Sequence, residues 1–412
     1  MARIGIYGGS FNPPHLGHIH AASQTRVLLG LDRVILVPDA VPPHKKLPEG
    51  SPDAQTRLEL VRLAAQGCAG LEVSDIELRR TGPSYTVDTL REFQAQYPQD
   101  ELFLLMGTDM YLCFDQWRGP AEISKMAALV CMYRTQAGGE LAAQLHEKAA
   151  KLEKSFGTRS VFAENSALEL SSTQARRLLF FGCGAQCVAP AVGARIEALR
   201  LYGCGADHTG LEFAALAAVC EPLYKPKRWL HAQGCAETAA GLARRFGAIA
   251  ADARRAGLLH DVTKALTDAQ QLAFCEQYAI ETTHSERESP WLLHAKTAAY
   301  AAERIFGEAP ELCSAIRWHT TGKADMTTLE KIIYIADYME PSRDFPGVED
   351  VRRTAFEDLD RGVLLGLEMS IRHLMQQGRT VESASIEARD FLKESGVCVD
   401  EILRKQKERG IS

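Results

Sequence analysis

Two glycines near the amino terminus have the setting of a phosphate-binding loop. Residues 7–18 read Tyr-Gly-Gly-Ser-Phe-Asn-Pro-Pro-His-Leu-Gly-His and follow a short apolar run. Gly8 and Gly9 let the backbone approach a polyphosphate, which a side chain at either position would block. Apolar residues with helical spacing follow from Leu16, so the free amides at the start of that helix point at the same place.

Two histidines, His15 and His18, stand three residues apart at this helix start. Side chains at this spacing lie about one helical turn apart and face one side. Imidazoles over a helix start suit a pentavalent phosphorus that gains negative charge during group transfer. The loop therefore predicts nucleotidyl transfer; the alternative interpretation is a glycine-rich turn with two surface histidines.

Two segments downstream offer groups for the rest of a nucleotide substrate. Lys45 and Lys46 follow the second apolar run and could reach a triphosphate from the side opposite the first loop. Tyr85 and Thr86 begin a helix after a tight turn, where backbone amides can bind a carboxylate or an amide group. Lysines in a loop are also common as plain solvent-exposed residues.

Further candidates follow a later apolar run and begin a later helix. Asp109 lies just past the run, where an acidic residue often binds ribose hydroxyls, and Trp117 could stack on a flat ring. Ser172 and Thr173 make a hydroxyl-rich helix start, with the guanidinium of Arg176 about one turn later. This last segment predicts a second anion-binding cradle.

The carboxyl-terminal half carries a different set of side chains. Its histidines and aspartates lie in runs with helical periodicity: His231, His260, Asp261, His294, His319 and Asp337. Four imidazoles and two carboxylates favour two borderline ions, iron or manganese, over calcium or a structural zinc. A single helical histidine is more often a core or surface residue. It is the ordered set of six that predicts metal binding.

The elements that must position these residues alternate up to about residue 200. Strands are predicted at residues 3–7, 33–37, 71–73, 101–106, 128–133 and 160–162, with helices beginning near Leu16, Gln55, Thr86, Ala121, Leu141 and Thr173. This order predicts an α/β doubly wound, Rossmann-like domain with ligands at the carboxyl ends of its strands. Helical periodicity dominates from Leu211, so we expect domains at residues 1–204 and 209–412, the second all-α.

Composition restricts the class of protein. A chain of 412 residues predicts two domains, and a net charge of −6 argues against a broad nucleic-acid-binding surface. The 11 cysteines are scattered without a Cys-x-x-Cys pair, which is typical of reduced thiols. No signal-peptide core and no apolar run of membrane-spanning length is present. We therefore expect a cytoplasmic protein with neither a nucleic-acid nor a membrane partner.

The first half resembles the nicotinate-nucleotide adenylyltransferases in five ordered blocks, residues 8–18, 37–45, 82–90, 107–117 and 171–176. The resemblance implies transfer of AMP from ATP to nicotinate mononucleotide, with Mg²⁺ on the phosphates and His15 and His18 stabilising the transferring phosphoryl group. The implied ATP- and phosphate-binding residues are Gly8, Gly9, Ser10, Phe11, Lys45, Asp109, Ser172, Thr173 and Arg176. The implied nicotinate mononucleotide-binding residues are Tyr85, Thr86 and Trp117.

Two positions depart from the pattern of that family. Asp39 stands where the family usually has a small hydroxyl residue, and Thr108 where it usually has alanine. Asp39 would place an acid near the phosphates. We expect this acid to tune metal or substrate affinity without abolishing the site.

The second half resembles the HD-superfamily phosphohydrolases, and more closely the bacterial symmetrical dinucleoside-tetraphosphate hydrolases. The resemblance rests on segments 227–231, 258–264, 292–296, 315–322 and 335–343. It implies cleavage of diadenosine tetraphosphate, a dinucleoside polyphosphate, into two ADP. One ion would be held by His231, His260, Asp261 and Asp337, and the other by Asp261, His294 and His319. The implied polyphosphate-binding residues are Lys264, Lys323 and Arg343.

Two alternatives stay open at this point. The carboxyl-terminal half could be a regulatory module that senses nucleotides without turning them over, or a hydrolase of another nucleotide. The amino-terminal half could use phosphopantetheine or another phosphate ester as acceptor. The sequence also leaves the oligomeric state open, a homo-oligomer included.

Overall fold

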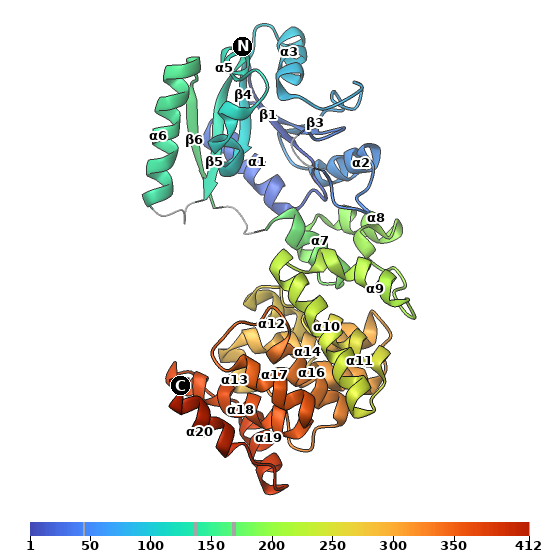
Figure 1. The fold of residues 1–412 in the computed structure, drawn as a ribbon. Helices are drawn as coiled ribbons and strands as arrows, with labels where there is room; N and C mark the ends of the chain where they lie inside the picture. Colours follow the sequence, from blue (N-terminus) through green and yellow to red (C-terminus); the bar gives the residue numbers. More distant parts are fainter. Residues whose placement is uncertain (44–45, 135–138, 167–169, 412) are drawn as a thin grey trace. The chain divides into compact units, whose positions relative to one another are not determined.

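The computed structural model describes residues 1–43, 46–134, 139–166 and 170–411. Within it the chain forms two compact units, Met1–Ala206 and Asp207–Ser412 (Figure 1).

The first unit is built on a six-stranded sheet in which every described pair of neighbouring strands is parallel. The strand order is β3-β2-β1-β4-β5-β6. The bounds are β1 Arg3–Gly9, β2 Arg33–Pro38, β3 Leu71–Val73, β4 Glu101–Gly107, β5 Ala127–Arg134 and β6 Ser160–Asn165. All six predicted strands are present. Short apolar runs in a chain that alternates strands with helices are typical of parallel strands, because helices cover both faces of such a sheet.

Helices cover both faces of this sheet (Figure 1). Helices α1 and α2 contact strands on one face, while α3 to α6 pack with the core cluster on the other. Their bounds are α1 Leu16–Leu28, α2 Ala54–Ala65, α3 Thr86–Gln96, α4 Thr108–Leu112, α5 Pro120–Met126 and α6 Gly139–Phe156, with α7 Ser172–Phe180 and α8 Pro190–Ala198 following. Helices α4 and α8 are short and are not among the helices predicted from the sequence.

The chain reverses its direction of winding between β1 and β4. Strand β1 pairs with β2 on one side and with β4 on the other, so the loops that leave β1 and β4 diverge to opposite faces. Such a switch point opens a crevice at the carboxyl ends of the two strands. Gly9 ends β1 and Gly107 ends β4, so these two glycines lie at the mouth of the crevice.

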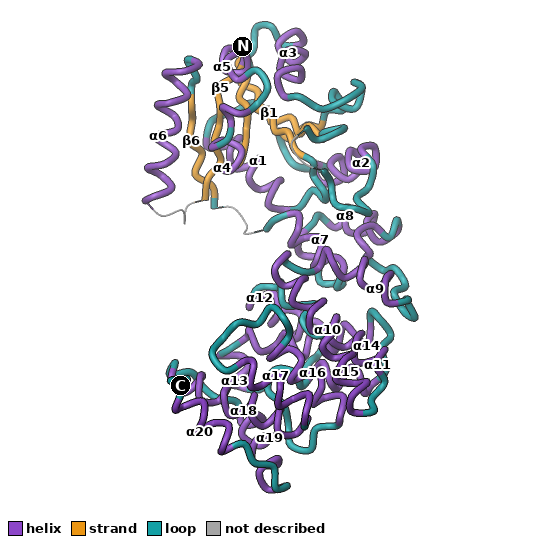
Figure 2. The backbone as a smooth tube through the Cα atoms, viewed as in Figure 1, coloured by secondary structure: helices purple, strands orange, loops and turns teal. Residues whose placement is uncertain are grey.

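The second unit is helical throughout its described residues, and Figure 2 shows strands only in the first unit. The bounds are α9 Phe213–Cys220, α10 Pro226–Phe246, α11 Ala250–Leu259, α12 Asp268–Gln277, α13 His284–Glu288, α14 His294–Arg304, α15 Pro310–Arg317, α16 Thr328–Met339, α17 Val348–Glu357, α18 Leu359–Gln376, α19 Ser383–Glu394 and α20 Asp400–Glu408. The predicted fold class, α/β followed by all-α, is confirmed.

Close packing of α10 and α11 brings His231 and His260 together. A Cβ at Gly257 of α11 would lie 2.8 Å from the Cα of Ala236 of α10, so no larger residue fits between the two helices. Helix α16 is fixed by a capping box between Thr327 and Glu330, and it buries Ile332 and its apolar neighbours. Helix α16 also packs against both α10 and α11, so the three helices meet around the same histidines.

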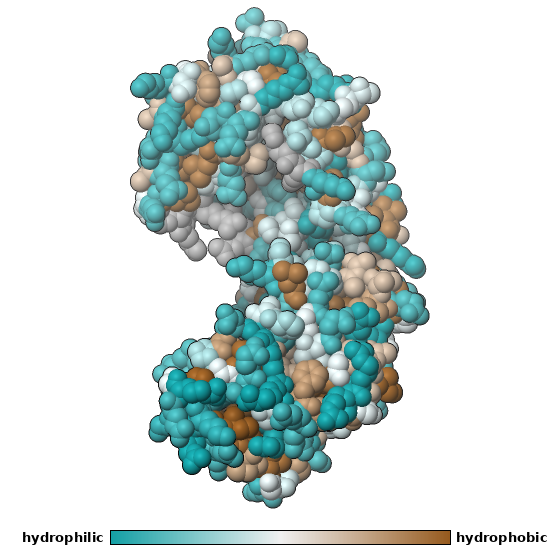
Figure 3. Space-filling view, in the orientation of Figure 1, coloured by the Kyte–Doolittle hydropathy of each residue, from teal (hydrophilic) through white to brown (hydrophobic). Residues whose placement is uncertain are grey.

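Hydrophilic residues cover most of the surface seen in Figure 3, and apolar residues lie there in small separate groups. Among the described residues, no helix combines the length and the apolar character that a bilayer-spanning segment requires.

Candidate functional sites

A cleft of about 660 Å³ lies at the switch point of the first unit. It is lined by the ends of β1 and β4 and by the loop that joins β1 to α1. Gly8, Gly9, Ser10, Phe11 and His18 are among its lining residues. The structure thus places most of the predicted phosphate-binding loop around one open space.

Gly8 leaves room at the wall of this cleft. A Cβ built on Gly8 would meet no atom within 4 Å, whereas one on Gly9 would lie 3.4 Å from the ring of Phe11. Neither glycine has a positive φ, so the backbone conformation does not require glycine at these positions. The space beside Gly8 is therefore available to a ligand, as the sequence analysis expects of a loop that approaches phosphate.

His15 and His18 form one stacked pair at the start of α1. Their ring centroids are 3.6 Å apart with an angle of 25° between the planes. The backbone N–H of His15 donates to Nδ1 of His18 over 3.2 Å, so the neutral His18 ring carries its proton on Nε2. Burial lowers the pKa of His15 to about 4, which keeps its ring uncharged at neutral pH. His18 lines the cleft, and the ring of His15 packs against the ring of His18.

The predicted anion cradle lies on the same cleft. Ser172, Thr173 and Arg176 of α7 line it, next to the helix start that Ser171 caps. The Arg176 guanidinium donates to the backbone oxygen of Asn12 over 2.7 Å and to Oγ1 of Thr173 over 3.1 Å. One side chain thus connects the start of α7 with the phosphate-binding loop.

The remaining predicted residues of the first unit divide into two groups. Thr86 and Trp117 line the cleft with the phosphate-binding loop. Tyr85 and Asp109 are not among the lining residues: the ring of Tyr85 packs under the Arg118 guanidinium, 4.4 Å away, and Asp109 is exposed in the first turn of α4. Lys45 lies outside the described residues.

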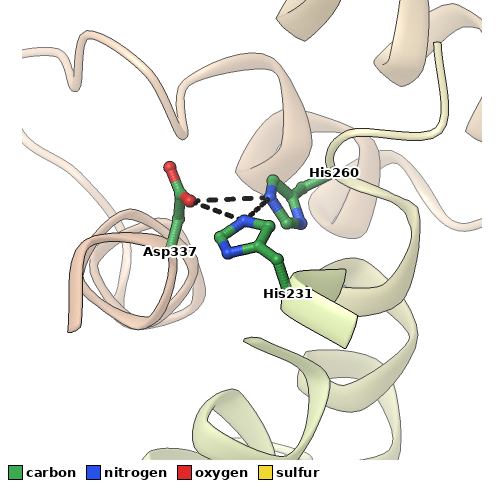
Figure 4. A group of neighbouring side chains, drawn as sticks. All are labelled: His231, His260 and Asp337. Atoms are coloured by element: carbon green, nitrogen blue, oxygen red, sulfur yellow. Dashed lines mark hydrogen bonds and ion pairs between the residues drawn. The ribbon is translucent and has the colours of Figure 1, made fainter. Parts of the chain in front are cut away.

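A second group of side chains converges in the second unit. His231 of α10, His260 at the end of α11 and Asp337 of α16 point toward one another (Figure 4). Nε2 of His231 lies 3.0 Å from Oδ1 of Asp337 and 3.2 Å from Nε2 of His260. The three helices described above supply these three side chains.

Asp261 connects this group with a second one. Its Oδ2 lies 3.5 Å from Nε2 of His260, and its Oδ1 lies 3.2 Å from Nε2 of His294 and 3.7 Å from Nε2 of His319. Nε2 of His294 and Nε2 of His319 are 3.1 Å apart. The six predicted ligands therefore lie in one cluster, in which all but the partly exposed Asp337 are buried, with the carboxylate of Asp261 between two pairs of imidazoles.

Nδ1 of each of the four histidine rings has a hydrogen-bond partner of its own. Nδ1 of His260, His294 and His319 lies 2.6–2.7 Å from a backbone oxygen three residues earlier. Nδ1 of His231 lies 2.9 Å from Oε1 of Glu340. A ring that donates from Nδ1 presents the lone pair of Nε2, which is the arrangement that metal-binding histidines adopt.

These donors fit divalent cations. Lone pairs on two Nε2 atoms face each other at about 3 Å, and the buried Oδ1 of Asp261 has no hydrogen-bond partner among the described residues. Burial opposes ionisation of Asp261 and Asp337, yet the neighbouring histidines hold the pKa of both well below the usual range. Burial, with Lys264 nearby, lowers the pKa of His294 to about 4. Burial opposes the positive charge on His260, yet Cys235 and Asp261 raise the pKa of its ring well above the usual value. Carboxylates and neutral imidazoles are the forms that bind metal, so binding of a cation here would release that proton.

Three cationic side chains contact the cluster. Nη1 of Arg228 lies 2.9 Å from Oδ2 of Asp261, Nη2 of Arg343 lies 2.6 Å from Oδ1 of Asp337, and Nζ of Lys264 lies 2.8 Å from Nε2 of His294. Lys323 contacts none of the six ligands. Its Nζ pairs with the buried Glu330, 3.1 Å away, and binding of polyphosphate by Lys323 stays a prediction.

Sequence reasoning missed three residues of these sites: Arg57, Arg228 and Glu340. Spacing could have found two of them, because Arg228 precedes His231 by three residues and Glu340 follows Asp337 by three. Residues three apart share one face of a helix. Arg57 offers no such signal, since its partners lie in other elements.

Two family models match the chain. Residues 6–178 match the cytidylyltransferase-like family, and residues 228–342 match the HD domain. The HD match implies binding of divalent metal, for which the cluster supplies candidate ligands.

Curated relatives match the first unit over nearly their whole length. A probable nicotinate-nucleotide adenylyltransferase of Pelobacter propionicus is 38% identical over 212 residues, which cover 48% of this chain and 98% of that protein. One from Pseudomonas syringae pv. tomato is 38% identical over 209 residues, with 48% and 93% covered.

Among solved structures, a predicted HD superfamily hydrolase involved in NAD metabolism from Clostridium acetobutylicum is 32% identical. The match covers 45% of this chain and 98% of that one, with a TM-score of 0.44. Through its first unit the chain belongs to the nicotinate-nucleotide adenylyltransferase family, and its second unit contains an HD domain.

Proposed function

We propose that the first unit transfers AMP from ATP to nicotinate mononucleotide, releasing nicotinate adenine dinucleotide and pyrophosphate. The observation that carries this proposal is the single cleft at the switch point. It brings together a phosphate-binding loop, the helix start with Arg176, and Thr86 with Trp117. Relatives named for this activity are 38% identical to the chain over about half of its length.

The reaction needs no covalent intermediate with the protein. A phosphate oxygen of the mononucleotide forms a bond to the α-phosphorus of ATP, while the bond from that phosphorus to the oxygen bridging to the β-phosphorus breaks. Pyrophosphate leaves with the electron pair. Such transfers are accelerated by positioning and by stabilisation of the charge that develops on phosphorus.

The residues of the cleft have distinct tasks in this scheme. The N–H on Nε2 of His18 donates to a non-bridging oxygen of the α-phosphate, and the packed ring of His15 fixes its orientation. Arg176 and the amides at the start of α7 bind the phosphates that leave. Mg²⁺ on the triphosphate would neutralise further charge.

We assign the acceptor ring to Trp117 and the start of α3, which also line the cleft. Trp117 offers a flat apolar surface for the pyridine ring. The amides at the start of α3, beside Thr86, favour the nicotinate carboxylate over an uncharged amide. Direct contacts from Lys45, Tyr85 and Asp109 stay predictions.

Incubation of the full-length chain with Mg²⁺ and ATP tests this proposal. Nicotinate mononucleotide, nicotinamide mononucleotide and phosphopantetheine are supplied in parallel, and products are measured by chromatography. We expect the highest kcat/KM with nicotinate mononucleotide. Preference for phosphopantetheine, or no adenylyl transfer to any acceptor, would contradict the proposal.

For the second unit we propose hydrolysis of a dinucleoside polyphosphate, diadenosine tetraphosphate, into two ADP. One divalent cation would be held by His231, His260 and Asp337 and another by His294 and His319, with Asp261 shared. Iron or manganese suits this mixed nitrogen and oxygen set. When bound, two such cations polarise phosphoryl oxygens and lower the pKa of water.

The chain's own cations support a polyphosphate substrate. Arg228, Lys264 and Arg343 surround the cluster within hydrogen-bond distance of its ligands. With the ligands engaged by metal, these three side chains are free to donate to phosphate oxygens. A substrate with more phosphates offers these three positive charges more negatively charged oxygens to bind.

Hydrolysis is tested with the full-length chain, diadenosine tetraphosphate and added iron(II) or manganese(II). His260→Ala removes a ligand, and His284→Ala, an exposed histidine of α13, is the matched control. We expect ADP from the wild type and the control but not from His260→Ala. Binding of the substrate without turnover under any metal would favour a nucleotide sensor instead.

A further inference from the structure

Arg57 of α2 is a charged side chain that none of the chemistry above uses. It is 1% exposed, and it does not line the cleft. Its guanidinium nevertheless reaches residues that do line it, Ser10 after β1 and Asp39 after β2. A fully buried arginine is rare unless its charge is paired and its hydrogen bonds are made.

The guanidinium connects the two loops by hydrogen bonds. Nη1 donates to the backbone oxygen of Ser10 over 2.7 Å and to Oδ1 of Asp39 over 2.8 Å. Nη2 donates to the backbone oxygen of Asp39 over 2.7 Å. The hydroxyl of Ser10 donates to the other carboxylate oxygen, Oδ2 of Asp39, over 2.6 Å. The two loops are thus joined through one buried ion pair.

Both carboxylate oxygens of Asp39 therefore have a partner. Asp39 lies in a cleft that should receive a triphosphate, and an uncompensated carboxylate there would repel it. The buried guanidinium of Arg57 supplies the compensating positive charge. The hydroxyl of Ser10 donates to the second carboxylate oxygen of Asp39.

We propose that Arg57 and Asp39 form a positioning pair for ATP: they hold the phosphate-binding loop in register and keep the carboxylate neutralised. This inference rests on the proposed adenylyl transfer and adds two residues to it. Neither residue is assigned contact with the transferring phosphorus; Arg57 acts through Ser10 and Asp39.

The test uses the full-length chain and four variants. Arg57→Met removes the charge at nearly constant shape and leaves Asp39 unpaired, whereas Asp39→Asn combined with Arg57→Met removes both charges. Arg57→Lys keeps the charge but cannot hold both loops with one fork. Arg62→Met on the same helix is the control, because Arg62 is about half exposed and pairs outside the cleft.

We expect Arg57→Met to raise the KM for Mg²⁺-ATP by about tenfold, with a small effect on the KM of the acceptor. The double variant should recover most of that increase, because the unpaired carboxylate is gone. A merely structural role predicts a lower Tm with unchanged KM and no recovery in the double variant, and this result would overturn the proposal. Should Arg57→Met not fold, Arg57→Lys decides: an unchanged KM for ATP overturns the proposal.

Calorimetric titration with Mg²⁺-ATP alone separates this inference from the proposed function. If the wild type binds ATP, makes no dinucleotide, and Arg57→Met weakens binding, the adenylyl transfer fails while the pair stands. If the wild type makes dinucleotide and Arg57→Met binds ATP normally, the pair fails and the function stands.

Discussion

Glu340 should set the affinity of one metal site and not of the other. Its side chain is 1% exposed, and Oε1 lies 2.9 Å from Nδ1 of His231, while Oε2 accepts from the backbone N–H of Ser342 over 2.7 Å. The carboxylate therefore fixes the ring of His231 and holds its proton on Nδ1, so that Nε2 presents its lone pair. Glu340→Gln keeps an acceptor oxygen at this place but removes the negative charge.

The expected size follows from this geometry. A hydrogen bond to a charged group contributes about 1.5–3 kcal/mol, and glutamine retains roughly half of it. The loss of about 0.8–1.5 kcal/mol corresponds to a Kd for one ion that is weaker by roughly fourfold to tenfold. Nδ1 of His294 and of His319 bonds to backbone oxygens, so the second ion should bind as in the wild type.

Calorimetric titration of metal-stripped protein with manganese(II) measures both sites. Glu349→Gln, an exposed glutamate of α17, is the matched control. We expect one weakened and one unchanged site in Glu340→Gln, and two unchanged sites in Glu349→Gln. Two unchanged sites in Glu340→Gln, or an equal loss at both, would refute the reasoning.

Three further predictions concern the first unit. Gly8→Val should raise the KM for ATP at least about tenfold with little change in Tm, because the new side chain meets no protein atom near its Cβ and enters the cleft; an unchanged KM in steady-state kinetics would be inconsistent with this. The imidazole of His15 should titrate with a pKa of about 4 by NMR, since burial disfavours its charged form. The folded state then binds fewer protons than the unfolded state, so the stability contributed by neutral His15 is complete above the ordinary histidine pKa and is lost as pH falls toward 4; an ordinary pKa in the folded chain would disprove this. Trp117→Ala should raise the KM for nicotinate mononucleotide about tenfold and leave that for ATP nearly unchanged, and the reverse pattern would assign Trp117 to the adenine end.

Much of the first unit could be predicted because its signals are local. Each apolar run is buried on both faces of a parallel sheet, and the turns between runs fix where strands end. Strand β3, residues Leu71–Val73, has the predicted bounds, and β4 differs by one residue. The phosphate-binding loop could be found for the same reason, since its glycines and histidines are contiguous.

Features that depend on partners distant in sequence could not be predicted. Asp39 reads as an acid facing phosphate, but its charge is compensated by Arg57, 18 positions away on another element. The ion pair of Lys323 with the buried Glu330 of α16 also joins two elements, and nothing in the sequence signals it.

The central claim is that one chain carries two independent sites for phosphorus chemistry, of which only the second uses protein-bound metal ions. Metal analysis of the full-length chain and of Asp261→Ala, with adenylyl transfer assayed in the same samples, tests it most directly. We expect two divalent ions per wild-type chain, almost none in Asp261→Ala, and equal rates of transfer in both. Wild type without bound metal after reconstitution, or loss of transfer in Asp261→Ala, would contradict the account.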